Sequence, residues 1–196
     1  MKTREIAVRR SMKSWFMVIL LAFAHVLLLL PHDAHAAVST AIAGDGTLGT
    51  TVNGQPLTTC TASCGISVGT LKGANQFHSF DVFSVGAGDV ATFNVPGGVT
   101  HILSRVTGLQ SGLSASMLYG AVETTTPVKF FFMNPAGIVF GPNAQLNVGS
   151  SVNFTTANYI RLFEETTQKS AMFYANPASD AVTTSGKASI LTIAPP

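Results

Sequence analysis

Beyond residue 36, short apolar or alternating runs follow one another along the chain, with glycine, proline and asparagine between them. Short runs separated by turn residues predict β-strands. No window there shows a sustained helical period, and residues 159–164 have room for one helical turn at most. Residues 56–73 are expected to form an irregular loop. The pattern predicts an all-β domain with strands at residues 38–43, 48–52, 77–83, 90–95, 101–106, 117–122, 128–133, 138–140, 145–148 and 152–156.

The run at residues 77–83 carries apolar side chains on both faces. Alternation along a strand places Phe77 and Phe83 on one face, and His78 and Phe80 on the other. A strand with apolar groups on both faces is typical of a sheet that is covered on both sides. We therefore expect this strand to be buried from two sides.

The turns between residues 128 and 156 distinguish two all-β architectures. Paired short strands build a sandwich or a barrel, whereas a right-handed parallel β-helix stacks coils of two or three short strands joined by tight corners. Hairpins of such short strands would have poorly specified registers, so we expect the single-stranded, right-handed parallel β-helix. Its continuous interior would contain Phe130, Phe132, Ile138, Phe140, Leu146, Val148, Val152 and Phe154.

The first 36 residues have the organisation of a secretory signal peptide, for which we expect a helix. A start rich in lysine and arginine precedes an apolar run at residues 15–30, and Ala34-His35-Ala36 fits the cleavage pattern of small residues. The run is shorter than the roughly 20 residues that span a bilayer. We expect cleavage after Ala36 and no stable membrane span afterwards; an uncleaved anchor is the alternative.

Charge is scarce once residues 1–36 are set aside. Five of the 11 basic and two of the nine acidic residues lie there, which leaves six basic and seven acidic residues in the rest of the chain. The slight overall basicity therefore belongs to the leader, and no basic patch is left to bind nucleic acid. So few charges favour a β-solenoid or an adhesive surface over a cytosolic enzyme.

The two cysteines, Cys60 and Cys64, lie in a segment rich in threonine, serine and glycine. In an oxidising compartment such a pair forms a local disulfide. Zinc needs two further ligands at suitable spacing, and none lies nearby. A redox pair usually has the shorter C-x-x-C spacing. We therefore expect a disulfide between these cysteines.

Three ordered segments carry a family resemblance: QFHSFDVF at residues 76–83, ILSRVTG at 102–108 and FMNPAGIVFGPNA at 132–144. Together they resemble the N-terminal secretion domain of the filamentous haemagglutinin family of two-partner secretion exoproteins, from about residue 38 to the end of the chain. The family motif Asn-Pro-Asn-Gly-Ile matches Asn134, Pro135, Gly137 and Ile138, with alanine at position 136. The second family motif, Asn-Pro-Asn-Leu, does not occur in the sequence.

The resemblance implies a right-handed parallel β-helix with an N-terminal β-cap over residues 37–196, incomplete at its C-terminus. It also implies export through a Gram-negative periplasm, recognition by the periplasmic domains of a dedicated outer-membrane barrel transporter, and a secreted or surface-associated adhesin with a host or surface receptor. The four matching motif residues are the candidates for transporter recognition and folding. An edge strand or groove within residues 75–140 would contact the transporter, with Phe77, His78, Phe80 and Arg105 as further candidates.

Two other classes of function stay open at this stage. The sequence shows no nucleophile elbow, metal-ligand set or carboxylate pair, so we expect no catalytic residue, metal or cofactor. A secreted β-helix lyase or hydrolase of polysaccharides would need about four charged side chains gathered on one face, as in clustered active sites. A β-sandwich binding module at the cell surface would need paired antiparallel hairpins.

Overall fold

The computed structural model describes residues 37–164 and 169–181. These belong to a compact unit that begins at Ala37, and the expected signal peptide at residues 1–36 lies outside the described residues. Across the described ranges, no helix combines the length and apolar character needed to cross a membrane. The same ranges contain strands and one short 3-10 helix, so the all-β prediction is confirmed.

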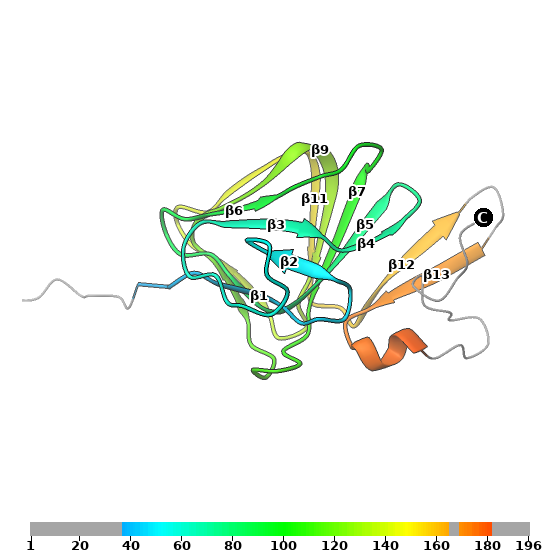
Figure 1. The fold of residues 1–196 in the computed structure, drawn as a ribbon, viewed down its shortest axis with the longest axis horizontal. Helices are drawn as coiled ribbons and strands as arrows, with labels where there is room; N and C mark the ends of the chain where they lie inside the picture. Colours follow the sequence, from blue (N-terminus) through cyan, green and yellow to red (C-terminus); the bar gives the residue numbers. More distant parts are fainter. Residues whose placement is uncertain (1–36, 165–168, 182–196) are drawn as a thin grey trace, which may run out of the picture. The chain divides into compact units, whose positions relative to one another are not determined.

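Stacked parallel coils form a β-solenoid of about four turns (Figure 1). One stack joins β3, β6 and the first halves of β9 and β11, and a second joins β5, β7 and the second halves of β9 and β11. A third, shorter stack pairs β8 with β10. The strands are β3 (Cys64–Val68), β5 (Asn75–Ser84), β6 (Val90–Phe93), β7 (His101–Val106), β8 (Ser116–Leu118), β9 (Ala121–Met133), β10 (Ile138–Phe140) and β11 (Gln145–Thr155).

Antiparallel strands cover the first coil and form the cap that the family resemblance implies. β1 (Ala41–Gly44) pairs with β5, β2 (Thr50–Val52) pairs with β3, and β4 (Thr70–Lys72) pairs with the start of β5. The turn that leads out of β2 has positive φ angles at Asn53 and Gly54, as the Asn-Gly dipeptide favours. The opposite end of the solenoid is β11, which pairs only with β9 among the described strands.

A separate hairpin packs on the outside of the solenoid. β12 (Tyr159–Glu164) and β13 (Lys169–Tyr174) pair antiparallel and are followed by the 3-10 helix η1 (Pro177–Ala181). Phe173 of β13 contacts Phe77 of β5 with 5.0 Å between ring centroids. The apolar cluster beneath the hairpin contains Leu48, Phe77, Leu103, Met133, Phe173 and Ala175.

The interior column is built mainly from phenylalanine. Phe130 and Phe132 are buried as predicted, and the ring of Phe83 contacts those of both Phe93 and Phe132 within the column. Offset and edge-to-face contacts of this kind add to the free energy gained by burying apolar area. Val148 completes the column on the last coil, and Phe154 and Ile138 are partly buried against it.

The structure corrects several sequence-based expectations about local structure. Residues 56–73 contain β3 and β4, and residues 159–164 form a strand instead of a helical turn. Residues 145–155 form one continuous strand. Three residues expected in the interior are exposed because they lie on the outermost coil, where no further coil covers them within the described chain: Phe140, Leu146 and Val152.

A β-bulge changes the face on which Phe83 lies. The pairing of β1 with β5 skips Asp81, because Ala43 lies opposite Val82 while Gly44 lies opposite Phe80. One extra residue in a strand reverses the alternation beyond it. Phe83 therefore joins Phe80 in the interior, whereas Phe77 packs outside the coil. The predicted shared face of Phe77 and Phe83 is wrong for this reason.

Candidate functional site

The motif residues form the corner between β9 and β10. Asn134 is fully buried, and its Nδ2 donates to the carbonyl oxygen of Ser114 at 2.9 Å and to Oγ of Ser116 at 2.9 Å. Its Oδ1 accepts a hydrogen bond from the backbone N–H of Ala136 at 3.0 Å. This last bond closes an Asx turn, which is the conformation that asparagine before proline favours.

Backbone hydrogen bonds join the same corner to the coils on either side. The N–H of Asn134 donates to Thr155 on the last coil at 3.0 Å, and the N–H of Ser116 donates to Gly137 at 3.0 Å. Gly137 has φ +119°, a region that disfavours side chains. Pro135 and Ile138 are half-buried on either side of this glycine. Because every polar group of Asn134 has a partner inside the domain, its side chain positions the corner and does not face a partner protein.

Arg105 is also buried, on the outer face of β7 beneath the hairpin. Its Nε donates to Oγ of Ser79 at 2.7 Å, and its Nη1 donates to the carbonyl oxygen of Tyr174 at 2.8 Å. Nη2 donates to Oγ1 of Thr47 at 3.1 Å and pairs with Oδ2 of Asp180 at 2.8 Å. A buried guanidinium requires such partners because an unpaired charge in the interior is costly.

The network around Arg105 continues through Asp45, a buried residue directly after β1. Oδ2 of Asp45 accepts hydrogen bonds from Ser79 Oγ at 2.6 Å and from Thr107 Oγ1 at 2.9 Å. Oδ1 accepts from the N–H of Thr47 at 2.9 Å. Polar groups from the cap, from two coils and from the hairpin thus meet at one point, which holds these elements together.

The other proposed contact residues, Phe77, His78 and Phe80, are fully buried on β5. β5 is not an edge strand, because it lies between β7 on one side and β1 and β4 on the other. In the folded domain these side chains and Arg105 therefore present no surface to a partner. The expectation of direct contact through them is not supported by their placement.

His78 is an unusual member of the interior. Its ring lies 5.4 Å from that of Phe93, and Nδ1 lies 3.4 Å from Oγ1 of Thr50. Nε2 has no hydrogen-bond partner. Burial disfavours the charged form and lowers the pKa of His78 to about 3. The imidazole is therefore neutral at physiological pH and acts as a packing group.

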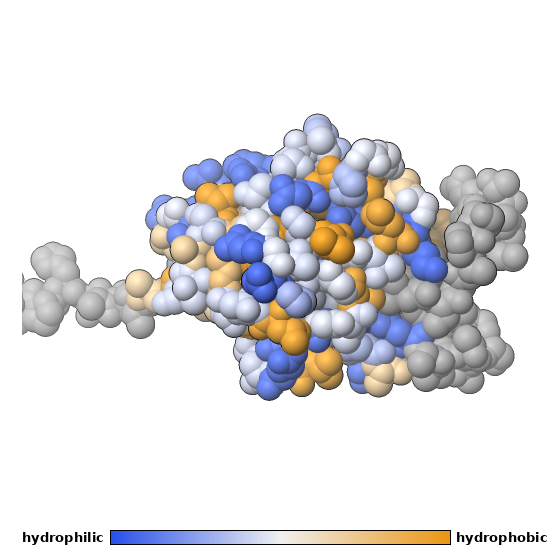
Figure 2. Space-filling view, in the orientation of Figure 1, coloured by the Kyte–Doolittle hydropathy of each residue, from blue (hydrophilic) through white to orange (hydrophobic). Residues whose placement is uncertain are grey.

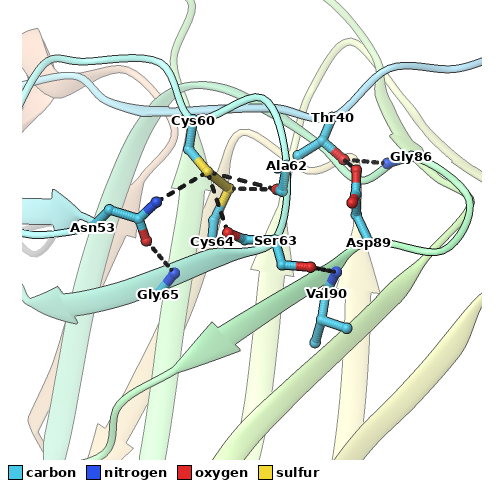
Figure 3. Close-up of a disulfide and its surroundings, with 10 residues drawn as sticks. All are labelled: Thr40, Asn53, Cys60, Ala62, Ser63, Cys64, Gly65, Gly86, Asp89 and Val90. Carbon is cyan, nitrogen blue, oxygen red and sulfur yellow. Dashed lines mark hydrogen bonds between the residues drawn. A yellow bond between two sulfur atoms is a disulfide. The ribbon is translucent and has the colours of Figure 1, made fainter.

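Cys60 and Cys64 form a disulfide beside the cap (Figure 3). Asn53 lies against it, donating from Nδ2 to Sγ of Cys60 at 3.3 Å and accepting at Oδ1 from the N–H of Gly65 at 2.7 Å. The backbone of Cys60 pairs with Ile42 of β1. The disulfide thus ties the start of β3 to the first strand of the cap.

The described residues contain no group of three or more His, Cys, Asp or Glu side chains placed to bind a metal ion. A surface hollow of about 500 Å³ is lined by uncharged residues only: Val68, Gly69, Leu71, Gln76, Asn94, Val95, Pro96 and Thr125. Proton transfer needs a titratable group within hydrogen-bond reach. This hollow therefore lacks the groups that a polysaccharide lyase or hydrolase would use.

Sequence reasoning missed the residues that surround Arg105. Asp45 and Asp180 lie far from Arg105 along the chain, and only the folded domain brings them into one network. On the face in Figure 2, apolar residues are interspersed with polar ones. Sequence reasoning also missed the exposed apolar side chains. The large ones are Leu57, Val68, Leu71, Leu109, Leu113, Val139, Phe140, Leu146, Val152, Tyr159 and Phe163.

Comparison with known proteins gives one result that bears on this architecture. A family model described as TPS secretion domain matches residues 40–192, which covers most of the chain. No curated protein and no solved structure matches the sequence.

Proposed function

The chain belongs to the TPS secretion domain family, the two-partner secretion domain of filamentous haemagglutinin type. We propose that its domain is recognised in the periplasm by an outer-membrane transporter and nucleates folding of the exported solenoid. Membership itself places the chain among secretion-targeting domains of Gram-negative exoproteins, which are not an enzyme family. Adhesion of the exported protein to a receptor is part of the same proposal.

The unequal ends of the solenoid carry the part of the proposal that concerns folding. Antiparallel strands β1 and β2 cover the first coil, whereas β11 at the other end pairs only with β9 among the described strands. Coils in a solenoid contact mainly their neighbours, so folding propagates from a stable end. A capped first coil and an open last coil favour growth from the N-terminal side, which suits a chain that emerges progressively from a pore.

The disulfide supports the proposed route of export. Disulfides form in oxidising compartments such as the periplasm and are rare in the cytosol. Cys60 and Cys64 are four residues apart in sequence, so the bond can form before distant parts of the chain fold. A bond that closes early and locally leaves the rest of the chain free to stay extended during passage through the outer membrane.

Export assays in the chain's own bacterium test the proposal. The mature chain is quantified in periplasm and medium, in the parent strain and in a strain that lacks the two-partner transporter. We expect it in the medium of the parent strain and in the periplasm of the other. Binding of the purified mature chain to the transporter's periplasmic domains is measured in parallel. Export that does not depend on the transporter would overturn the proposal.

A further inference from the structure

The loop between β7 and β8, residues 107–115, exposes two large apolar side chains. Leu109 is 57% exposed and Leu113 is 45% exposed. Residues 107–115 contain no charged side chain. Scattered exposed leucines are common on protein surfaces, so exposure alone assigns no role to this pair. The hydrogen bonds and backbone contacts that fix the loop distinguish this pair from other exposed leucines.

Asp81, the residue of the β-bulge, holds the first half of the loop. Its Oδ1 accepts hydrogen bonds from the N–H groups of Gln110 at 2.6 Å and Ser111 at 3.1 Å. Its carbonyl oxygen accepts from the N–H of Gly108 at 3.1 Å. Hydrogen bonds to an ionised acceptor are stronger than neutral ones. Asp81 therefore positions the first half of the loop.

Glycine allows the loop to fold back tightly on itself. Gly108 has φ +59°, and a Cβ atom at this position would clash with the backbone of Leu113. The N–H of Gly112 donates to the carbonyl oxygen of Gly108 at 2.9 Å. The backbone of Leu113 thus lies against Gly108, the residue before Leu109, so the two leucines project from neighbouring backbone positions.

The buried motif residue holds the second half of the loop. Nδ2 of Asn134 donates to the carbonyl oxygen of Ser114, the residue after Leu113. Asp81 and Asn134 therefore brace the loop on both sides of the leucine pair. A loop fixed before binding loses little conformational entropy when a partner binds. Asn134 thus helps to hold an exposed loop, although its own side chain is buried.

We infer that Leu109 and Leu113 form a docking surface for an apolar, uncharged pocket on the periplasmic part of the transporter. This inference deepens the proposed function and rests on it. The observations that favour this occupant are the bracing by the family's own motif residue and the absence of charge from the loop. Each leucine side chain that a partner desolvates contributes to binding through the apolar area it buries.

The double variant Leu109→Ser/Leu113→Ser tests the inference, with Leu57→Ser/Leu71→Ser as the matched control. Leu57 and Leu71 are each 53% exposed and lie outside the loop. Each full-length variant replaces the parent gene, and the chain is quantified in periplasm and medium. Binding of each purified mature chain to the transporter's periplasmic domains is measured by titration calorimetry. Unfolding in urea verifies that both variants fold as stably as the parent.

We expect the loop variant to bind on the order of tenfold more weakly or worse and to accumulate in the periplasm, while the control matches the parent. If both variants bind and are exported as well as the parent, and export of the parent depends on the transporter, the inference is overturned and the proposed function stands. Export of the parent chain in the strain that lacks the transporter would instead overturn the proposed function. If the parent chain is a dimer, and only the loop substitutions convert it to a monomer without loss of export, the leucine surface serves self-association. That outcome would also overturn the inference.

Discussion

Arg105 and Asp180 form a salt bridge, with 2.8 Å between Nη2 and Oδ2, that joins the second coil of the solenoid to the helix after the outer hairpin. The arginine side chain is fully buried and that of the aspartate is 18% exposed. The same guanidinium bonds Ser79 and the carbonyl oxygen of Tyr174. The hairpin is therefore attached by one central cation as well as by its apolar contacts.

Replacement of Arg105 by methionine is expected to destabilise the domain by about 3 kcal/mol, because partners of a buried charge lose their hydrogen bonds. The hairpin would detach first, since Phe173 also loses its contact with the guanidinium, which lies 5.2 Å from its ring. Urea unfolding and limited proteolysis between β13 and η1 measure the two effects. Arg161→Met, on the exposed face of β12, is the control and should change stability little. Equal effects of both substitutions would show that Arg105 does not attach the hairpin.

The solenoid could be predicted from the sequence because its corners contain residue types with restricted backbone conformations. Asn134 before Pro135, and glycine at 137, specify a tight corner wherever they occur. The runs at residues 101–106 and 138–140 coincide with β7 and β10. These features depend on local geometry, which neighbouring residues determine.

The features that the sequence did not reveal depend on contacts between distant segments. The bulge at Asp81 becomes apparent only when β1 is paired with β5. The strand at residues 159–164 does alternate, since Ile160 and Leu162 pack against the solenoid while Phe163 is exposed. A single short strand is difficult to assign without its partner, which here is β13. The exposure of Phe140 likewise depends on how many coils follow.

Substitution of Asn134 by alanine should lower the free energy of unfolding by about 2–3 kcal/mol, because the carbonyl oxygen of Ser114 and the buried hydroxyl of Ser116 lose a donor. The same variant should export poorly if the corner positions the leucine loop. Asn143→Ala is the matched control, as Asn143 is an exposed corner residue. Urea unfolding and export of both variants provide the measurement. If the Asn134 variant is destabilised but binds the transporter as tightly as the parent, the corner stabilises the fold and does not contribute to recognition.

His78 should make stability dependent on pH. Its pKa is lowered to about 3 in the folded domain by burial, from 6.5, so the unfolded chain binds the extra proton between these values. The stability contributed by neutral His78 is complete above pH 6.5 and decreases as the pH falls towards 3, by on the order of 5 kcal/mol in total. Urea unfolding of the parent and of His78→Leu at pH 7.5, 6, 5 and 4 isolates this contribution. Parallel curves for the two proteins would contradict it.

Reduction of the Cys60–Cys64 disulfide should cost about 2 kcal/mol, the value expected for a loop this short from the entropy of the unfolded chain. The loss should appear first in the cap, because Cys60 pairs with Ile42 of β1. Hydrogen exchange of β1 and β11, with and without dithiothreitol, locates the effect. Cys60→Ala/Cys64→Ala should unfold identically in both conditions. A larger increase in exchange on reduction in β11 than in β1 would contradict the assignment to the cap.

Two glycines of the leucine loop offer a comparison in which only one steric contact differs. Gly108 and Gly112 both have positive φ, but a Cβ atom would meet the backbone of Leu113 at Gly108 and nothing within 4 Å at Gly112. Gly112→Ala should cost about 1–2 kcal/mol from backbone strain alone. Gly108→Ala carries the same strain and also forces the backbone of Leu113 away, so we expect a larger loss of stability and a loop that no longer holds the two leucines together. Urea unfolding gives the first quantity, and binding to the transporter's periplasmic domains gives the second. Equal effects of the two substitutions on both measurements would show that the close approach of Leu113 to Gly108 does not shape the docking surface.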